Sequence, residues 1–178
     1  FEKTHHLFFL QRVNRKPDGL CILLDKNIFP APAQVIGVDF HDFGSRVILL
    51  LLWDKHLMLN THLTFPHNNS YDPVMRMHQA QKIVSILQRY PNHAKILGGD
   101  FNGSIHDDAV RILLDEGALA PMSKKLDFVT HHSHRGDSMA CDLILTSSHF
   151  TSGVPLIGSI DAALSDHAMV TSELRAKL

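Results

Sequence analysis

Hydrophobic and polar positions along the chain predict a mixture of strands and helices. Short apolar runs bounded by polar or turn-forming residues are typical of strands. The runs at 45–53 and 56–65 are separated only by Asp54 and Lys55, so we expect them to form a hairpin buried on at least one face. The complete set of expected strands is 19–29, 45–53, 56–65, 94–100, 128–132, 141–146 and 168–174.

Two segments show the spacing of amphipathic helices. In residues 72–91, Asp72 is the expected N-cap and Pro73 the first helical residue. One face of this helix carries an apolar stripe made of Val74, Met77, Ile83, Val84, Ile86 and Leu87. A second helix is expected at 106–117, with acids in its first turn and Gly117 at its end. This order predicts a single α/β (α+β) domain over residues 1–178, with helices packed on a mixed sheet.

Composition and charge narrow the class of protein. The chain has 178 residues, 44% of them hydrophobic and 20% charged, which is ordinary for a globular domain. The longest apolar run, Val47 to Trp53, is too short to span a bilayer, so we expect no membrane partner. A net charge of -1 argues against gripping nucleic acid by bulk electrostatics, but it is compatible with a phosphate site neutralised by metal ions.

The two cysteines, Cys21 and Cys141, provide neither a disulfide framework nor the spacing of a metal site. Both lie in apolar stretches, so we expect buried free thiols. Such thiols are compatible with a reducing, intracellular compartment.

Polar residues gather where the expected strands end. Asp100 and Asn102 follow two glycines at the end of the strand 94–100. A carboxylate at this position can bind a hard cation or orient a water molecule, and an amide can donate to a phosphate oxygen. The alternative is a simple turn, since Gly, Asp and Asn are common turn formers.

Three further strand ends carry candidate chemistry. Asp166 and His167 lie just before an apolar strand. The carboxylate of Asp166 can bind a metal ion and His167 can act as a general acid or base, and the alternative is that they only cap a helix or strand. Asp142 opens an apolar strand and needs a partner, for which a histidine is natural, unless it lies in solvent. His62 lies in an apolar strand, where a histidine is more often a satisfied core residue than a catalyst.

Two other groups of polar residues have weaker signals. Arg76 and Gln79 share a helix face, and both are compatible with a solvated position. Residues 131–134, with the sequence HHSH, look like a metal tract, but strand alternation separates His131 from His132 and His134. We therefore interpret this tract as a feature of a strand end.

In order along the chain, these motifs resemble the deoxyribonuclease I-like endonuclease/exonuclease/phosphatase superfamily. The variants are most similar to carbon-catabolite-repressor-type deadenylases and nocturnin-like enzymes. The resemblance extends from Asp18 to Leu174 and rests on the joint order of DGLCILLDK, NTHL, RMHQ, GGDFN, HRGDSMACDLIL and SDHAMV.

The resemblance implies a fold and a set of roles. The fold is a four-layer sandwich, in which two mixed sheets pack face to face with helices outside. Members hydrolyse phosphoester bonds with Mg²⁺ or Mn²⁺. The implied catalytic residues are His62, Asp100, Asn102, Asp142 and His167, the implied metal ligands are Asp100 and Asp166, and the implied supporting residues are Arg76 and Gln79.

One part of the family pattern is not found in this sequence. The resemblance implies a metal-binding Glu, often in a QE pair, upstream of the DG motif. Here Gln11 is followed by Arg12, and Glu2 has no such context. We therefore expect the chain to represent the C-terminal two-thirds of the domain, with a sheet incomplete at its N-terminal side.

The resemblance predicts a metal-dependent phosphodiester hydrolase, a nuclease whose substrate is single-stranded RNA. Two alternatives stay open. One is a catalytically inactive fragment or binding member of the same superfamily. The other is a phosphatase of a small phosphorylated molecule or lipid.

Overall fold

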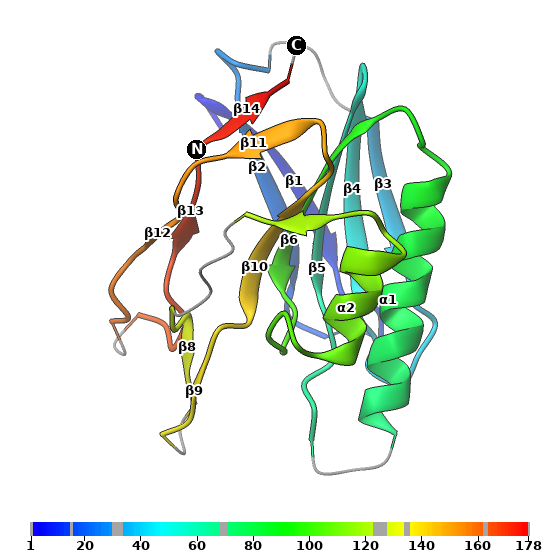
Figure 1. Ribbon diagram of the computed structural model, residues 1–178, viewed down its shortest axis with the longest axis vertical. Helices are drawn as coiled ribbons and strands as arrows, with labels where there is room; N and C mark the ends of the chain where they lie inside the picture. The colour runs from blue at the N-terminus through cyan, green and yellow to red at the C-terminus, as the bar shows by residue number, and fades with distance from the viewer. Residues whose placement is uncertain are drawn as a thin grey trace.

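A six-stranded mixed sheet forms the centre of the molecule. The computed structural model describes residues 2–14, 16–29, 34–67, 71–122, 128–133, 136–161 and 164–177. Strands β5 and β6 run parallel, and every other neighbouring pair in this sheet is antiparallel. The strand order, shown in Figure 1, is β3 (Gln34–Asp39), β4 (Val47–Trp53), β5 (His56–His62), β6 (Ala94–Asp100), β10 (Asp142–Thr146) and β7 (Ala120–Pro121).

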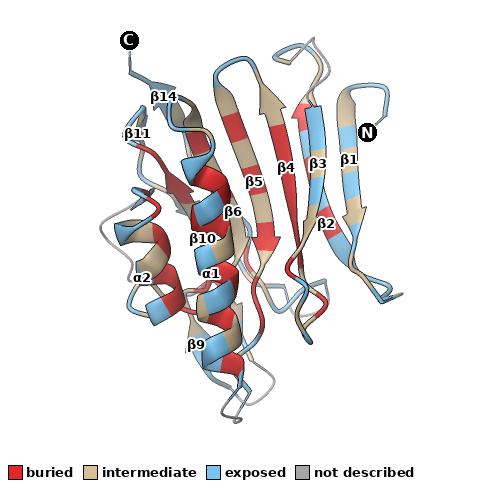
Figure 2. Ribbon diagram, turned by 90° about the vertical axis from the view of Figure 1, so that its right-hand side faces the viewer, coloured by how far each residue is buried: buried red, intermediate tan, exposed pale blue. Residues whose placement is uncertain are grey.

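The two faces of this sheet bury different partners. Helices α1 (Asp72–Gln88) and α2 (Asp108–Asp115) lie against one face (Figure 2). An antiparallel ribbon of β1 (His5–Gln11) and β2 (Gly19–Asp25) packs on the other face. Strand β4 is buried on both faces, because alternate side chains point in opposite directions. Its Ile48 and Leu50 join the core under the helices, and Val47, Leu49 and Leu51 join the core under β2.

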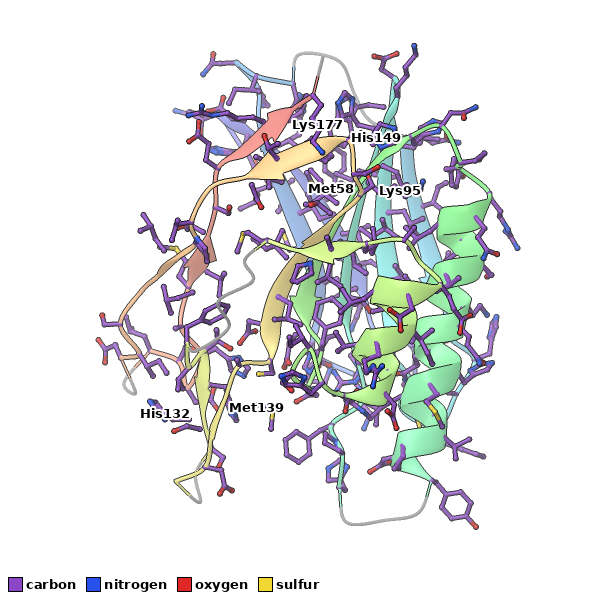
Figure 3. All side chains as sticks on the ribbon, viewed as in Figure 1. Met58, Lys95, His132, Met139, His149 and Lys177 are labelled. Carbon is purple, nitrogen blue, oxygen red and sulfur yellow. The ribbon has the colours of Figure 1, made fainter. Side chains whose placement is uncertain are left out.

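Three short antiparallel pairs complete the described strands. Strand β8 (His131–His132) pairs with β9 (Ser138–Met139), and Figure 3 shows His132 and Met139 on this pair. Strand β11 (Phe150–Ser152) pairs with β14 (Leu174–Ala176), and β12 (Leu156–Ile157) pairs with β13 (Val170–Thr171). No helix in the described ranges is long and apolar enough to cross a membrane.

The predicted α/β class, with a mixed sheet and helices outside, is confirmed. The predicted hairpin is also present as β4 and β5, joined at Asp54 and Lys55. Its first strand begins at Val47 rather than at Ser45, because Ser45 has a φ of 54° and belongs to a turn. The strand expected at 128–132 is reduced to β8, and the one expected at 168–174 is divided between β13 and β14.

The first half of helix α1 differs from the prediction. Its N-cap is Tyr71, and Asp72 lies inside the helix, where its Oδ2 accepts a hydrogen bond from the backbone N–H of His67. Val74, expected on the buried stripe, is 62% exposed. The face turned inward at this level is polar, because it covers loops whose backbone groups need hydrogen-bond partners rather than an apolar core.

The prediction of a buried thiol is wrong for Cys21 and right for Cys141. Strand β2 buries only every second residue, namely Leu20, Ile22 and Leu24, against the sheet. Cys21 lies between two of them and therefore points outward.

The parallel pair β5–β6 depends on a glycine. In its register Thr61 faces Gly99, which has a φ of 145° that side chains rarely adopt. A Cβ at this position would collide with the carbonyl oxygen of Thr61. By contrast, a Cβ on the neighbouring Gly98 would meet nothing within 4 Å.

We therefore expect Gly99→Ala to lower the free energy of unfolding by roughly 1–3 kcal/mol, because β5 and β6 must separate to admit the methyl group. Gly98→Ala is the matched control and should change it far less. Urea unfolding of both variants measures the difference. Equal stabilities would contradict the close packing of Gly99 against β5.

Candidate active site at the ends of three neighbouring strands

Three of the predicted site residues lie at one level of the central sheet. His62, the last residue of β5, is in register with Asp100, the last residue of β6. Asp142, the first residue of β10, is in register with the same Asp100 from the other side. Because β10 runs antiparallel to β6, its beginning meets the end of β6. The sheet itself therefore brings the three side chains to one edge.

The side chains at this edge form an alternating series of carboxylates and imidazoles. Nδ1 of His167 lies 2.8 Å from Oδ2 of Asp142, within hydrogen-bond distance. Nε2 of His62 lies 3.3 Å from Oδ2 of Asp100, and Nε2 of His167 lies 4.0 Å from the same oxygen. Asp100 is thus flanked by two imidazoles, and the second of them is held by Asp142.

His167 reaches the site from a loop between β12 and β13. An isolated backbone bridge ties it to His131, and the two imidazole rings lie 4.4 Å apart between centroids. Strand alternation in the HHSH tract predicts that His131 and His132 point to opposite faces. In the structure His131 is half-buried and His132 is exposed, and His134 lies outside the described residues. Sequence reasoning did not bring His131 to His167, because no spacing links residues 36 positions apart.

The two predicted metal ligands lie in different groups. Asp100 belongs to a group with Cys141, Asp142 and His167, whose potential ligand atoms lie within 4.8 Å of one another. Asp166 belongs to a second group with His131 and His167, and its Oδ2 lies 3.4 Å from Nε2 of His131. Its side chain is 66% exposed. His167 is the one residue shared by both groups.

Asn102 closes a tight turn after β6. It has a φ of 49°, in the left-handed region that asparagine tolerates better than most residues. Its backbone N–H donates to Oδ1 of Asp100 at 2.8 Å, and its side-chain amide donates to the carbonyl oxygen of Leu63 at 2.9 Å. The turn alternative is therefore correct as a description of the backbone. It also orients the Asp100 carboxylate, so that Oδ2 faces the imidazoles.

Arg76 and Gln79 are buried, so the solvated alternative is wrong for both. Nη1 of Arg76 donates to the carbonyl oxygens of Thr64 and Phe101, at 2.8 and 2.9 Å. Its Nη2 forms an ion pair with Oδ1 of Asp107 at 2.7 Å. The Arg76 side chain therefore connects the two loops that continue from β5 and β6.

Gln79, on the next turn of the helix, connects the loop after β5 to the segment between β3 and β4. Its Oε1 accepts from the backbone N–H of Thr64, and its Nε2 donates to the Thr64 hydroxyl and to Oδ2 of Asp42. Neither Arg76 nor Gln79 has a described contact with His62, Asp100 or His167. Both hold the loops that carry the site.

The local environment gives the two histidines opposite pKa shifts. Burial, reinforced by the charge of Arg46, lowers the pKa of His62 to about 4 and outweighs the attraction of Asp100. Burial also acts to lower the pKa of His167, but the hydrogen bond and charge of Asp142 outweigh it and raise that pKa above 6.5. His62 is consequently neutral near pH 7, whereas His167 is readily protonated.

The donor set at Asp100 fits a hard divalent cation. Oδ1 of Asp100 accepts from the backbone N–H of Asn102, and Oδ2 faces the imidazole of His62 at 3.3 Å. Burial raises the pKa of the Cys141 thiol, which therefore stays protonated, and its Sγ lies 3.6 Å from Oδ2 of Asp142. A protonated thiol is not a metal ligand. What remains is carboxylate oxygen and imidazole nitrogen, and the carboxylate oxygens are the ligands that a hard divalent cation prefers.

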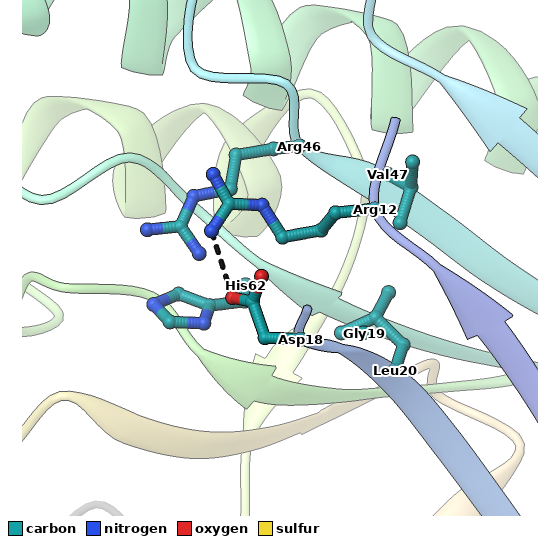
Figure 4. A pocket seen from close by; sticks show the side chains of 7 residues that line it. All are labelled: Arg12, Asp18, Gly19, Leu20, Arg46, Val47 and His62. Atoms are coloured by element: carbon teal, nitrogen blue, oxygen red, sulfur yellow. Dashed lines mark hydrogen bonds and ion pairs between the residues drawn. The ribbon is translucent and has the colours of Figure 1, made fainter. Parts of the chain in front are cut away.

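One basic group beside His62 was not predicted. Arg46 falls within the strand expected at 45–53, where the sequence pattern gives it no functional signal. In the structure it lies just before β4 and lines a pocket together with His62 and Arg12 (Figure 4). Its position depends on the turn at Ser45, which the apolar pattern does not reveal.

Comparisons with known proteins identify a family and similar folds. Residues 3–167 match the model of the Endonuclease/Exonuclease/phosphatase family. An Arabidopsis thaliana protein described as an uncharacterized calcium-binding protein is 28% identical over 179 residues, which cover 84% of this chain and 37% of that protein. This chain thus spans little more than a third of the length of that relative.

Solved structures share the fold at low sequence identity. The structure of TDP2 from Caenorhabditis elegans matches with a TM-score of 0.71 at 16% identity, over 98% of this chain and 58% of that chain. The catalytic domain of human nocturnin, solved with a bound sulfate anion, matches with a TM-score of 0.69 at 15% identity, over 99% of this chain and 74% of that chain. The family match covers nearly the whole chain, and so the chain belongs to the Endonuclease/Exonuclease/phosphatase family.

Proposed function

We propose that this chain carries the site of a metal-dependent phosphodiester hydrolase that acts on single-stranded RNA. The observation that supports the proposal is the series Asp142, His167, Asp100 and His62 at one edge of the sheet. It combines an oriented imidazole, a carboxylate that can hold a cation and a second, neutral imidazole. Hydrolysis of a phosphodiester needs groups of these types around one phosphorus atom.

Asp100 would hold the cation through Oδ2, and Asp166 is the second candidate ligand. A bound Mg²⁺ or Mn²⁺ would supply positive charge to the phosphate oxygens and lower the pKa of a coordinated water. Oδ1 of Asp100 is already fixed by the backbone of Asn102, so the carboxylate needs no reorganisation to present its other oxygen.

His167 is suited to handle the proton. Its Nδ1 is engaged by Asp142, which leaves Nε2 to face the substrate side. In hydrolysis, a water oxygen bonds to phosphorus, the bond from phosphorus to the leaving oxygen breaks, and the leaving oxygen takes a proton. The raised pKa of His167 keeps Nε2 protonated in part of the population near neutral pH. Such an imidazolium can also donate to a charged phosphate oxygen.

His62 and Asn102 would act as neutral groups. The lowered pKa of His62 removes its charge at pH 7, so that it contributes a directed imidazole rather than a cation. The amide of Asn102 uses one donor on Leu63 and has a second for a phosphate oxygen. These assignments follow the family resemblance of the motifs NTHL and GGDFN.

RNA is the proposed substrate because the motif variants resemble those of deadenylases and nocturnin-like enzymes. Nocturnin shares the fold, and its structure contains a sulfate, which has the tetrahedral shape and charge distribution of a phosphate group. The family also includes phosphatases. If the chain hydrolyses a small phosphorylated molecule but not RNA, the proposed nuclease activity is wrong and the phosphatase alternative replaces it.

The direct test is Mg²⁺-dependent hydrolysis of a short RNA that ends in adenosines. We expect Asp100→Asn to lower the rate roughly 10²-fold or more, because the oxygen that would hold the cation loses its charge. His167→Gln should lower it roughly 10²- to 10⁴-fold through loss of proton transfer. The matched control is Asp115→Asn, which removes the same charge from an exposed position on α2. Equal rates for Asp100→Asn and Asp115→Asn would exclude Asp100 from the reaction.

The histidine assignments predict a titration order in the metal-free protein. By NMR of the imidazole protons, His62 should titrate near pH 4 and His167 above pH 6.5. Between pH 6.5 and about 4 the unfolded chain binds more protons at residue 62, so this residue lowers stability as the pH falls. At residue 167 the folded chain binds protons more tightly than the unfolded chain, because the pKa of His167 is raised. The free energy of unfolding therefore falls as the pH rises above 6.5. The reverse order of titration would contradict the burial of His62 and the support of His167 by Asp142.

A further inference from the structure

A polar pocket lies beside His62, on the side away from His167. Its walls come from the segment between β1 and β2, from the turn before β4 and from the end of β5 (Figure 4). In the sheet, Ile48 pairs with Thr61, so the residues just before β4 reach the same edge as His62. The lining residues are Arg12, Asp18, Gly19, Leu20, Arg46, Val47 and His62.

Arg12 is fixed within this pocket by three hydrogen bonds. Nη1 donates to Oδ2 of Asp18 at 2.7 Å, Nη2 donates to the carbonyl oxygen of Gly44 at 2.6 Å, and Nε donates to that of Ser45 at 3.4 Å. The guanidinium therefore braces the turn that precedes β4. Its charge is balanced by Asp18, with which it also forms an ion pair.

Arg46 has no comparable partner. Within the part of the chain that the structure describes, its guanidinium makes no hydrogen bond and no ion pair, and its Nη1 is buried without an acceptor. A buried donor left unsatisfied costs roughly 1–3 kcal/mol, so native structures rarely retain one without a reason. Asp18 attracts Arg46, but its Oδ2 is already engaged by Arg12.

The charges around Arg46 favour an added anion. Burial and the charge of Arg12 both lower the pKa of Arg46, as expected for a guanidinium held beside another one. Asp100 and Asp42 attract Arg46, but neither comes within ion-pair distance of it, and Asp42 is instead engaged by Gln79. Within the described residues, no carboxylate forms an ion pair with the Arg46 guanidinium, which therefore has donors for an anion.

We propose that Arg46, braced by Arg12, binds a second phosphate group of the substrate, next to the phosphate at which the reaction takes place. This inference rests on the proposed function and specifies its substrate class. Across the edge formed by β10, β6, β5 and β4, the groups follow as Asp142, Asp100, His62 and Arg46, the last of them just before β4. His167 is held beside Asp142 at the first position of this line. The line starts at the reacting group and ends at the unpaired guanidinium. A chain of nucleotides carries the consecutive phosphates that such a line can hold, whereas a monophosphate has only one.

A guanidinium is well suited to this task. Its planar fork offers parallel donors that match two oxygens of one phosphate. Lysine at the same position would keep the charge but lose the fork. We therefore expect binding at Arg46 to depend on the number of phosphates in the substrate and not on the identity of its bases.

The test compares two ligands by calorimetry in a metal-free buffer. One is a 5′-phosphorylated adenosine dinucleotide, with two phosphates, and the other is adenosine 5′-monophosphate, with one. We expect Arg46→Gln to weaken binding of the dinucleotide roughly tenfold or more and to leave the monophosphate within about twofold. Arg46→Lys should give an intermediate loss. Arg111→Gln removes the same charge from an exposed position on α2 and should alter neither ligand.

Equal weakening of both ligands by Arg46→Gln would overturn the inference, because it would assign Arg46 to the first phosphate or to the fold. Unchanged binding of the dinucleotide, or no detectable binding to the parent chain, would also overturn it. If only the proposed hydrolysis is wrong, Arg46→Gln will still weaken binding of the dinucleotide more than binding of the monophosphate, but the chain will show no metal-dependent turnover. If the chain hydrolyses RNA but Arg46→Gln weakens binding of the two ligands equally, only the proposal of a second phosphate site is wrong.

The Tm of Arg46→Gln distinguishes a ligand-binding role of Arg46 from a structural one. Because the Arg46 guanidinium is unpaired in the free chain, its replacement should leave the Tm unchanged or raise it. A marked fall in Tm would mean that Arg46 supports the fold, and would overturn its assignment as a ligand-binding group.

Discussion

The parallel pairing of β5 with β6 is the constraint on which the rest of the site depends. It sets His62 opposite Asp100, and the antiparallel addition of β10 sets Asp142 opposite the same residue. The pairing requires Gly99, where backbone comes too close for any side chain. The two glycines before Asp100 are therefore part of the sheet, and the acid that follows them is placed by the strand rather than by a flexible loop.

Beyond the strand ends, the site depends on a polar core under the first turns of α1. Arg76 and Gln79 occupy the inward face of this helix and satisfy the backbone of the loops that leave β5 and β6. An apolar face at the same level would leave those carbonyl and N–H groups without partners. The loss of amphipathic character in the first half of α1 is thus the consequence of supporting loops that carry function.

The sequence predicted the central elements well because they follow simple periodicities. The hairpin, both helices and the strand that ends at Asp100 were identifiable from apolar runs and caps. The strand-end acids Asp100 and Asp142 meet in register at one edge of the sheet. Other features depend on tertiary contacts and have no local signal. The outward position of Cys21 depends on which face of β2 meets the sheet, and the proximity of His131 to His167 depends on a bridge between distant segments. Arg46 enters the pocket only because the chain turns at Ser45.

The central claim is that Asp100, between two imidazoles, holds a divalent cation at this edge of the sheet. A crystal structure of the protein with Mn²⁺ and inorganic phosphate, phased on the anomalous signal of the metal, tests it most directly. The account predicts an anomalous peak at coordinating distance from Oδ2 of Asp100, with a phosphate oxygen near His62 and His167. A metal bound elsewhere, with the Asp100 carboxylate free, would contradict it.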